Sequence, residues 1–289
     1  MGYSFTNILG QFIIDGNFKI IKKGQSENPE VPKKDIPKIL AQLKDKKYHQ
    51  DFYIKNLELT KASIKQSVSE DSLIVQTIAN INELDRTANT LIKRLREWYA
   101  LYFPEFEHKF THQEKFVSLI LEKNREELMK TMNITKTMGA NLEEVHVEEM
   151  KLLAKRIQSL QLLRKEHEEY LEKVMRKYCP NLLELAGVTI GAKLLELGKS
   201  LKRLALLPAS TVQLLGAEKA LFRHIKTGAR SPKYGVIFQH QIIQNAKRQQ
   251  RGKAARILAD KLSLCCRLDY FKGELKAPEY RAEIERKLQ

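Results

Sequence analysis

Two long stretches of the chain carry apolar residues at alternating intervals of four and three, the spacing of helices that bury one face along their whole length. The positions of the first stretch are Ile74, Ile78, Ile81, Asp85, Ala88, Ile92, Leu95, Tyr99 and Tyr102. Those of the second are Leu153, Ile157, Leu160, Arg164, His167, Leu171, Val174 and Tyr178. Neither contains Gly or Pro between its ends, so each can form a helix of about 30 residues, roughly 45 Å long.

A single amphipathic helix of this kind would more often belong to an ordinary helical bundle than to a dedicated coiled coil. Two such helices in one chain favour a long antiparallel coiled-coil hairpin, which we predict for residues 71–179. Pro104 ends the first helix, because proline lacks an amide donor and clashes with the preceding turn. A further helix is predicted from about His112 to Thr131, before a polar break at residues 138–141.

Residues 103–138, between the two long helices, carry more apolar side chains than two helices alone would cover. We therefore expect the chain to form a homodimer through this end of the coiled coil. The predicted dimerisation contacts are Phe116, Leu119, Ile120 and Leu128.

The chain opens on two short apolar runs, residues 12–14 and 18–21, separated by Asp15-Gly16-Asn17. This combination is typical of a β-hairpin. Residues 25–34 are polar and contain prolines, which indicates a loop, and helical spacing follows at Ile36, Ile39, Leu40 and Leu43. We predict a small α/β domain over residues 1–70.

Residues 181–208 also have helical character, with glycines at 187, 191 and 198 that permit close helix approach or mark turns. Another helix is predicted from about Ala246 to Arg267. Since the pattern of this region does not indicate strands, we predict an all-α domain over residues 180–289. The fold class is then mainly α, with a sheet only in the small N-terminal domain.

The charge of the chain indicates a binding surface. Lys and Arg number 51 against 35 Asp and Glu, a net charge of +16, which attracts polyanions and makes nucleic acid the first partner to consider. Between Gly216 and Lys261 there are eleven basic residues against Glu218 and Asp260 alone. Because like charges repel, such crowding favours a site for a phosphate backbone.

Within this stretch, residues 227–235 (TGARSPKYG) form a predicted loop that presents Arg230, Lys233 and Tyr234. Cations beside an aromatic ring suit phosphate contacts and base stacking. The helix that follows has a basic side at Arg248, Arg251, Lys253 and Arg256. A basic helix face is usually only solvated, but a basic loop beside a basic helix favours a binding site.

Familiar catalytic and metal motifs are incomplete. Gly198-Lys199-Ser200 resembles the end of a P-loop, but Lys193 stands where the earlier glycine is required. His108 and His112 have zinc-protease spacing, but Lys109 replaces the glutamate. We therefore predict a chain that is not an enzyme and that holds no metal or cofactor of its own.

Compartment follows from what the sequence lacks. No apolar run approaches the ~20 residues that span a bilayer, and Met1 to Phe12 lacks the basic and apolar regions of a signal peptide. The cysteines are Cys179, Cys265 and Cys266, and adjacent cysteines rarely pair because of disulfide geometry. These features predict an intracellular protein in a reducing compartment, with no membrane partner and with Cys265-Cys266 in a packing role.

The segment from Leu207 to His224 (LPASTVQLLGAEKALFRH) closely resembles the signature of the Nop domain, and the likeness continues through residues 226–235 and 251–256. The chain is similar to the archaeal core protein of box C/D ribonucleoproteins, a family that includes eukaryotic nucleolar Nop proteins and a spliceosomal relative. The resemblance is strong over residues 180–275 and clear in the coiled coil.

This resemblance implies a scaffold in a complex that performs guide-directed 2′-O-methylation of RNA during rRNA processing. The Nop domain would bind a composite surface of box C/D guide RNA, folded as a kink-turn, and its ribosomal-like protein. The N-terminal domain, shorter here than the family pattern, would hold the methyltransferase fibrillarin. Fibrillarin, and not this chain, would bind S-adenosylmethionine.

The resemblance also assigns site residues. Those at the junction with the kink-turn and its protein would be Gly216, Ala217, Glu218, Lys219, Arg223, His224 and Lys226. The RNA-facing loop would comprise Arg230, Ser231, Pro232, Lys233 and Tyr234. The guide backbone would be held by Lys247, Arg248, Arg251, Lys253 and Arg256.

Two alternatives to this scaffold remain. One is a general RNA- or DNA-binding protein that the coiled coil merely dimerises, and the other is a spliceosomal-type Nop protein without a methyltransferase. The small size and the lack of a long basic tail favour the archaeal type. The expected location is the cytoplasm of an archaeal cell, or the nucleolus if the chain is eukaryotic.

Overall fold

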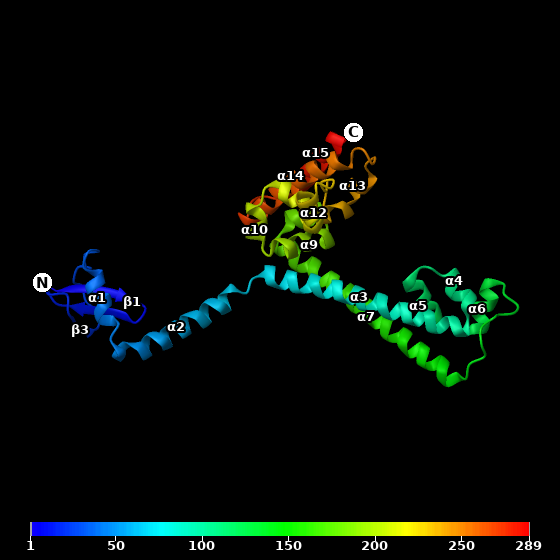
Figure 1. The fold of residues 1–289 in the computed structure, drawn as a ribbon, viewed down its shortest axis with the longest axis horizontal. Coiled ribbons are helices and arrows are strands. Elements are labelled where there is room, and N and C mark those ends of the chain that lie inside the picture. Colours follow the sequence, from blue (N-terminus) through cyan, green and yellow to red (C-terminus); the bar gives the residue numbers. More distant parts are fainter. Residues whose placement is uncertain (1, 289) are drawn as a thin grey trace. The chain divides into compact units, whose positions relative to one another are not determined.

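The computed structural model describes residues 2–288 and is mainly helical, with one small antiparallel sheet (Figure 1). This confirms the predicted fold class. The chain divides into two compact units, one ending at Ser69 and one beginning at Glu70. Among residues 2–288, no helix is long and apolar enough to cross a membrane.

The N-terminal unit contains a three-stranded sheet of order β1-β2-β3, formed by Tyr3–Asn7, Gly10–Ile14 and Ile20–Lys23. The predicted hairpin is β2–β3. Its turn forms because the Asp15 carboxylate accepts the N–H groups of Asn17 at 2.9 Å and Lys19 at 2.7 Å. Strand β1 was not predicted. Helix α1 (Ile36–Leu43) covers the sheet, and the buried side chains between them include Phe12, Ile14, Ile39 and Leu43.

Helix α2 (Lys46–Ser67) follows, capped by the Asp45 side chain, which accepts the Lys47 N–H. None of its 22 residues is buried. The sequence pattern did not reveal this helix, because periodicity reports a helix most clearly when one face is buried.

The two long helices are confirmed as α3 (Glu70–Tyr102) and α7 (Glu144–Tyr178), which pack along each other (Figure 1). All positions predicted for the first buried face are buried except Asp85 and Tyr102, which are half-buried. On α7, none of the eight predicted positions is exposed, but only Ile157 and Leu171 are fully buried. The other buried residues of α7 are Met150, Ala154 and Met175.

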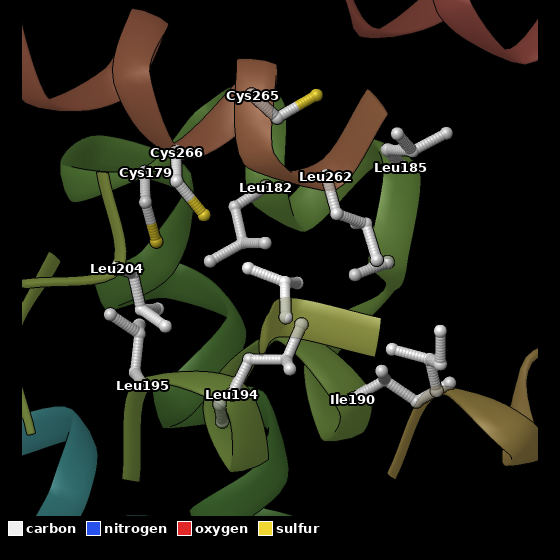
Figure 2. Close-up of a cluster of buried hydrophobic side chains, with 14 of the residues drawn as sticks. Cys179, Leu182, Leu185, Ile190, Leu194, Leu195, Leu204, Leu262, Cys265 and Cys266 are labelled. Carbon is white, nitrogen blue, oxygen red and sulfur yellow. The ribbon is translucent and has the colours of Figure 1, made fainter. Parts of the chain in front are cut away.

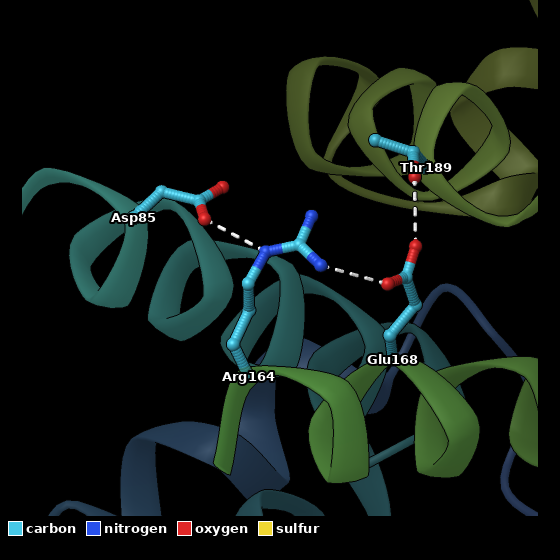
Figure 3. Close-up of polar contacts among 4 residues, drawn as sticks. All are labelled: Asp85, Arg164, Glu168 and Thr189. Carbon is cyan, nitrogen blue, oxygen red and sulfur yellow. Dashed lines mark hydrogen bonds and ion pairs between the residues drawn. The ribbon is translucent and has the colours of Figure 1, made fainter. Parts of the chain in front are cut away.

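A polar layer interrupts the apolar contact between α3 and α7 (Figure 3). Arg164 Nε donates to Asp85 at 2.7 Å, and Arg164 Nη1 lies 2.9 Å from Glu168. Glu168 in turn accepts the Thr189 hydroxyl at 3.4 Å. A polar pair inside an apolar seam favours one register over its alternatives, so this layer fixes how the two helices align.

The far end of the coiled coil consists of α4 (Pro104–Lys109), α5 (Gln113–Glu122) and α6 (Arg125–Met132). The single helix predicted over residues 112–131 is wrong, because Asn124 starts a new helix. Its side chain accepts the Glu127 N–H at 2.9 Å while the Glu127 carboxylate accepts the Asn124 N–H at 3.0 Å. This reciprocal capping ends α5 and begins α6.

Three of the four predicted dimerisation residues lie inside this end rather than on its surface. Phe116, Ile120 and Leu128 are fully buried in an intramolecular cluster, and Leu119 is partly buried against it. A second copy cannot contact the three buried side chains without opening the cluster. The apolar pattern therefore indicated a core and not a contact surface, and this part of the prediction is corrected.

The rest of the second unit is helical. Its elements are α8 (Pro180–Ala186), α9 (Val188–Gly198), α10 (Leu201–Leu206), α11 (Ala209–Leu214), α12 (Glu218–Thr227), η1 (Val236–Gln239), α13 (Gln241–Asn245), α14 (Arg251–Tyr270) and α15 (Ala277–Leu288). The helix predicted from Ala246 begins five residues later, at Arg251. One core joins these helices to the base of α3 and α7, and it includes Cys179, Cys265 and Cys266 (Figure 2). The predicted packing role of Cys265-Cys266 agrees with this burial.

Buried polar groups start two of these helices. The Asp269 carboxylate accepts the N–H groups of Asn181 at 3.0 Å and Leu182 at 2.8 Å, at the start of α8. The Asn181 side-chain oxygen accepts the N–H groups of Lys276 at 2.7 Å and Ala277 at 3.1 Å, at the start of α15. Residues far apart in sequence thereby satisfy each other's free helix-end donors.

An ion pair fastens α15 to α14. Lys261, almost fully buried, has its Nζ 2.5 Å from Glu283 Oε2, and Lys287 Nζ lies 2.6 Å from Glu283 Oε1. The hydrogen bonds from these two lysines lower the pKa of Glu283 from 4.5 to about 2.

Because the pKa of Glu283 is lower in the folded than in the unfolded chain, its carboxylate stabilises the fold at neutral pH. We expect this contribution to be lost as the pH falls from about 5 towards 2. Melting temperatures of the parent and of Glu283→Gln, measured across this range, should converge at low pH. Glu279→Gln, on the same helix but without an ion pair among the described residues, should follow the parent. Parallel curves for the parent and Glu283→Gln would contradict the assignment.

Candidate nucleic-acid interface

The predicted binding residues lie on α12, on the loop of residues 228–235, at residues 247 and 248 and at the start of α14, and we call this surface the basic edge. His224 links α12 to the loop, and Lys233 links the loop to α14. Helix α12 has no buried residue, so it lies outside the core. Most of its side chains are therefore available to a partner.

The loop is anchored to α11 by backbone hydrogen bonds. Gly235 N–H donates to Gln213 O at 2.8 Å, and Val236 N–H donates to Leu215 O at 2.8 Å. The approach is so close that a Cβ added at Gly235 would lie 1.9 Å from Leu215 O. Only glycine fits here, and its closeness to α11 fixes the loop's direction.

The start of α12 is built by the signature residues themselves. Gly216 has φ +85°, which favours glycine, and its N–H donates to Glu218 Oε1 at 2.7 Å. Ala217 is the half-buried N-cap residue. Gly216, Ala217 and Glu218 therefore shape the turn, whatever they contact in a complex.

The end of α12 is closed in a similar way. Gly228 has φ +67° and donates its N–H to His224 O at 2.9 Å. The His224 ring Nδ1 contacts Ala229 O. His224 thus holds the beginning of the loop against the helix.

Tyr234 and Arg251 are also engaged inside the protein. The Tyr234 ring stacks on Phe238, with centroids 4.5 Å apart and planes 10° apart. Arg251 lies over the Phe238 ring at 5.7 Å and donates to Ala246 O and Gln244 O. One face of Tyr234 is therefore occupied, and Arg251 holds the segment before α14 in place.

The remaining predicted cations are exposed and make no ion pair among residues 2–288. They are Lys219, Arg223, Lys226, Arg230, Lys233, Lys247, Arg248, Lys253 and Arg256. Ser231 is exposed and Pro232 half-buried in the same loop. Unpaired surface cations repel one another, and an anionic ligand would relieve that repulsion.

The start of α14 adds backbone donors to this charge. The N-cap residue Gln250 makes no side-chain capping bond, and the first turn contains no acidic residue. The Lys233 side chain passes close by, since a Cβ added at Gly252 would lie 3.5 Å from Lys233 Cδ. The positive end of a 20-residue helix beside lysine and arginine side chains suits a phosphate group.

Two apolar side chains of the interface were missed. Phe222 and Ile225 on α12 are 68% and 71% exposed, three residues apart and therefore on one side of the helix. Such spacing normally predicts a core contact, and only the structure shows that this side faces outward. Exposed apolar side chains among cations are typical of a surface for another protein.

The described residues do not include a group of three or more His, Cys, Asp or Glu that could hold a metal ion. The cysteines are fully buried, and burial raises the pKa of Cys265 to about 12. The thiol therefore stays protonated at neutral pH, which makes it a poor nucleophile.

Fold and site together define an α-helical protein in which a coiled-coil hairpin carries a helical domain with a basic edge. The family model described as "Nop: snoRNA binding domain, fibrillarin" matches residues 80–289. The chain is 40% identical to an uncharacterised NOP5 family protein of Methanocaldococcus jannaschii, over 80% of this chain and 60% of that protein. It is 34% identical to nucleolar protein 56 of Schizosaccharomyces pombe, over 73% of this chain and 47% of that protein.

The chain therefore belongs to the Nop family, and it spans about half to three fifths of the length of these two relatives. Among solved structures it is similar to a chain of a fibrillarin/Nop5p complex. That match has a TM-score of 0.50 and 26% identity and covers 99% of this chain and all of the other. The predicted family is thus confirmed.

Gly235 offers a test of how the loop is built. Gly235→Ala places a methyl group against Leu215 O, and we expect it to lower the free energy of unfolding by about 2 kcal/mol or to displace the loop. Gly252→Ala is the control, because its added Cβ makes only an ordinary contact. Urea unfolding of both variants measures the difference, and equal stability would contradict the close approach of residues 215 and 235.

Proposed function

We propose that the chain is a noncatalytic scaffold of a box C/D RNA-guided 2′-O-methyltransferase particle. Its C-terminal domain would bind the guide RNA together with the kink-turn-binding ribosomal-like protein. The observation that carries this proposal is a single edge that combines free cations, the uncapped start of α14 and the exposed apolar pair Phe222 and Ile225. Cations suit the RNA, and the apolar pair suits the protein.

The N-terminal unit would bind fibrillarin, which would supply the catalytic site and hold S-adenosylmethionine. Support comes from the similarity to a chain of a fibrillarin/Nop5p complex, which extends over nearly the whole of this chain. Family relatives are named nucleolar proteins. A eukaryotic copy would accordingly act in the nucleolus and an archaeal one in the cytoplasm.

A homodimer through the coiled coil is the third part of the proposal, and exposed residues of α7 suggest where it would form. Val145, Leu152, Leu163 and Tyr170 are all exposed, and successive members are seven, eleven and seven residues apart. At 100° per residue they lie on one side of α7, away from the contact with α3. A face of this kind suits a second copy of the same helix.

The alternative is a general RNA-binding dimer, or a spliceosomal-type relative, without a methyltransferase partner. The exposed cations alone would serve such a protein equally well. The apolar pair on α12 favours recognition of an RNA already bound to protein, because apolar side chains do not bind phosphate but can pack against a protein surface.

Binding experiments separate these functions. We expect the full chain to bind a kink-turn RNA weakly alone and about tenfold or more tightly with the ribosomal-like protein present. Arg230→Ala with Lys233→Ala should weaken both states and reduce the salt dependence of the affinity. Phe222→Ala should weaken only the complex that contains the protein. Binding indifferent to RNA shape and to the protein would leave a general RNA binder.

The dimer face is tested by charge. Leu152→Glu with Leu163→Glu should convert a dimer to monomer in sedimentation equilibrium, because two buried carboxylates would face two others across the interface. Leu162→Glu is the control, since Leu162 is also exposed but lies on another side of α7. A parent chain that is already monomeric, or a double variant that stays dimeric, would rule out this face.

A further inference from the structure

A concave surface lies next to the basic edge. It is a groove of about 950 Å³ between the start of α9, the segment of η1 and α13, and the end of α15. None of the predicted site residues except Lys247 lines it. The groove is large enough to hold part of a polymer chain rather than a single ion.

The walls of the groove are held at a fixed distance by His240, which is almost fully buried. Its Nδ1 accepts the Ile242 N–H at 3.2 Å, so Nε2 carries the proton and donates to Leu185 O at 2.9 Å. Burial lowers the pKa of His240, which keeps this neutral arrangement at physiological pH. The groove is thus a built feature of the fold.

Amide side chains without partners line the groove. Gln239, Gln241, Asn245 and Gln250 are exposed there, and none of their side chains makes a hydrogen bond within residues 2–288. An amide offers a donor and an acceptor side by side, which matches the paired donor and acceptor groups of a nucleobase edge. Four free amides in one groove suit unpaired bases.

Two cations and one helix end complete the groove. Arg281 and Lys247 both line the groove, and Arg281 Nη2 donates to Glu184 O at 3.2 Å. The start of α9 has Gly187 at its N-cap, with no side-chain cap and no acidic residue in the first turn. A Cβ added at Gly187 would meet nothing within 4 Å, so there is space beside this helix end, where the Glu168 carboxylate of α7 accepts the Thr189 hydroxyl.

Lys247 and Gln250 connect the groove to the basic edge, because Arg248 and Arg251 belong to the same short segment. We propose that unpaired nucleotides of the RNA bound at the basic edge continue into this groove, with bases against the amides and phosphate near Arg281 and Lys247. The proposal rests on RNA binding by the C-terminal domain and adds a site for a single-stranded segment.

An acidic peptide is the competing occupant. Glu285 also lines the groove, and its carboxylate would repel either polyanion, so the choice between them depends on the amides. The four neutral amides would give an acidic peptide little charge attraction, whereas they serve base edges directly. The observations therefore favour RNA.

The test uses the full chain and a kink-turn hairpin with or without a short single-stranded tail containing 4-thiouridine. The parent should bind the tailed RNA about tenfold more tightly than the blunt hairpin. Asn245→Ala with Arg281→Ala should abolish this gain and leave blunt-hairpin affinity unchanged. Gln249→Ala with Arg286→Ala removes the same types of side chain outside the groove and should retain the gain.

Crosslinking locates the tail independently. Photoactivated 4-thiouridine should crosslink to residues 239–250 or 281–288, and crosslinks confined to residues 216–235 would overturn the proposal. An equal loss of affinity for blunt and tailed RNA in the groove variant would also overturn the proposal. So would a groove that binds a glutamate-rich peptide but not the single-stranded tail. If the parent binds neither hairpin, the proposal of RNA binding at the basic edge fails. Crosslinking of an oligonucleotide with the sequence of the tail then tests the groove by itself.

Discussion

The packing of the base of α3 and α7 against α9 is the constraint on which the second unit depends. Ile74, Ile78 and Met175 lie in one buried cluster with Leu194 and Leu195 of α9. Each buried side chain of this size contributes about 1.5–3 kcal/mol, so separating the coiled coil from the C-terminal helices would cost about as much as a typical domain's whole stability. The buried carboxylate of Asp71 adds to this junction, since it accepts the Tyr178 hydroxyl at 2.9 Å and the Leu201 N–H at 3.0 Å. The basic edge and the far end of the coiled coil therefore belong to one compact unit.

Periodicity predicted the long helices of the second unit well, but it did not predict which surfaces cover them. The four-three spacing gave α3 almost residue by residue, because a helix that packs along its length must repeat its apolar side chains. The same signal at Phe116 and Leu128 marked buried positions, yet a pattern cannot say whether the covering surface belongs to the same chain. Breaks were harder still. Asn124 and Glu127 have the Asn-x-x-Glu spacing of a capping box, which is a sequence signature of a helix start. The prediction weighed only the apolar periodicity and so missed the start of α6, which these two residues set by reciprocal hydrogen bonds.

On the predicted nucleic-acid interface, composition indicated a region rich in cations but could not divide its residues by role. The excess of Lys and Arg predicted a basic surface, and most of those cations are exposed and without ion pairs among residues 2–288. Arg251 carries the same charge but holds the backbone of residues 244 and 246, and Glu218 closes the turn at Gly216. The charge of a side chain follows from the sequence, whereas these roles depend on which backbone carbonyl or amide lies within hydrogen-bonding distance of it in the fold. Phe222 and Ile225 show the reverse case, in which an apolar pair expected in a core faces outward.

Selectivity must come from parts of this surface other than its charge. Phosphate contacts are similar for every RNA and weaken together as salt rises, so in the proposed complex the free cations would supply affinity without choosing a partner. Selecting one partner over another requires side chains that hold fixed positions, or side chains that contribute only when a partner of the right chemistry covers them. The loop meets the first condition, because Gly235 is pressed against Leu215 O and Tyr234 is stacked on Phe238. The α12 pair meets the second, because an exposed aromatic and a β-branched side chain gain free energy only when another apolar surface covers them. A particle that already contains RNA and protein can contact both the fixed loop and the α12 pair, whereas naked RNA can contact only the loop.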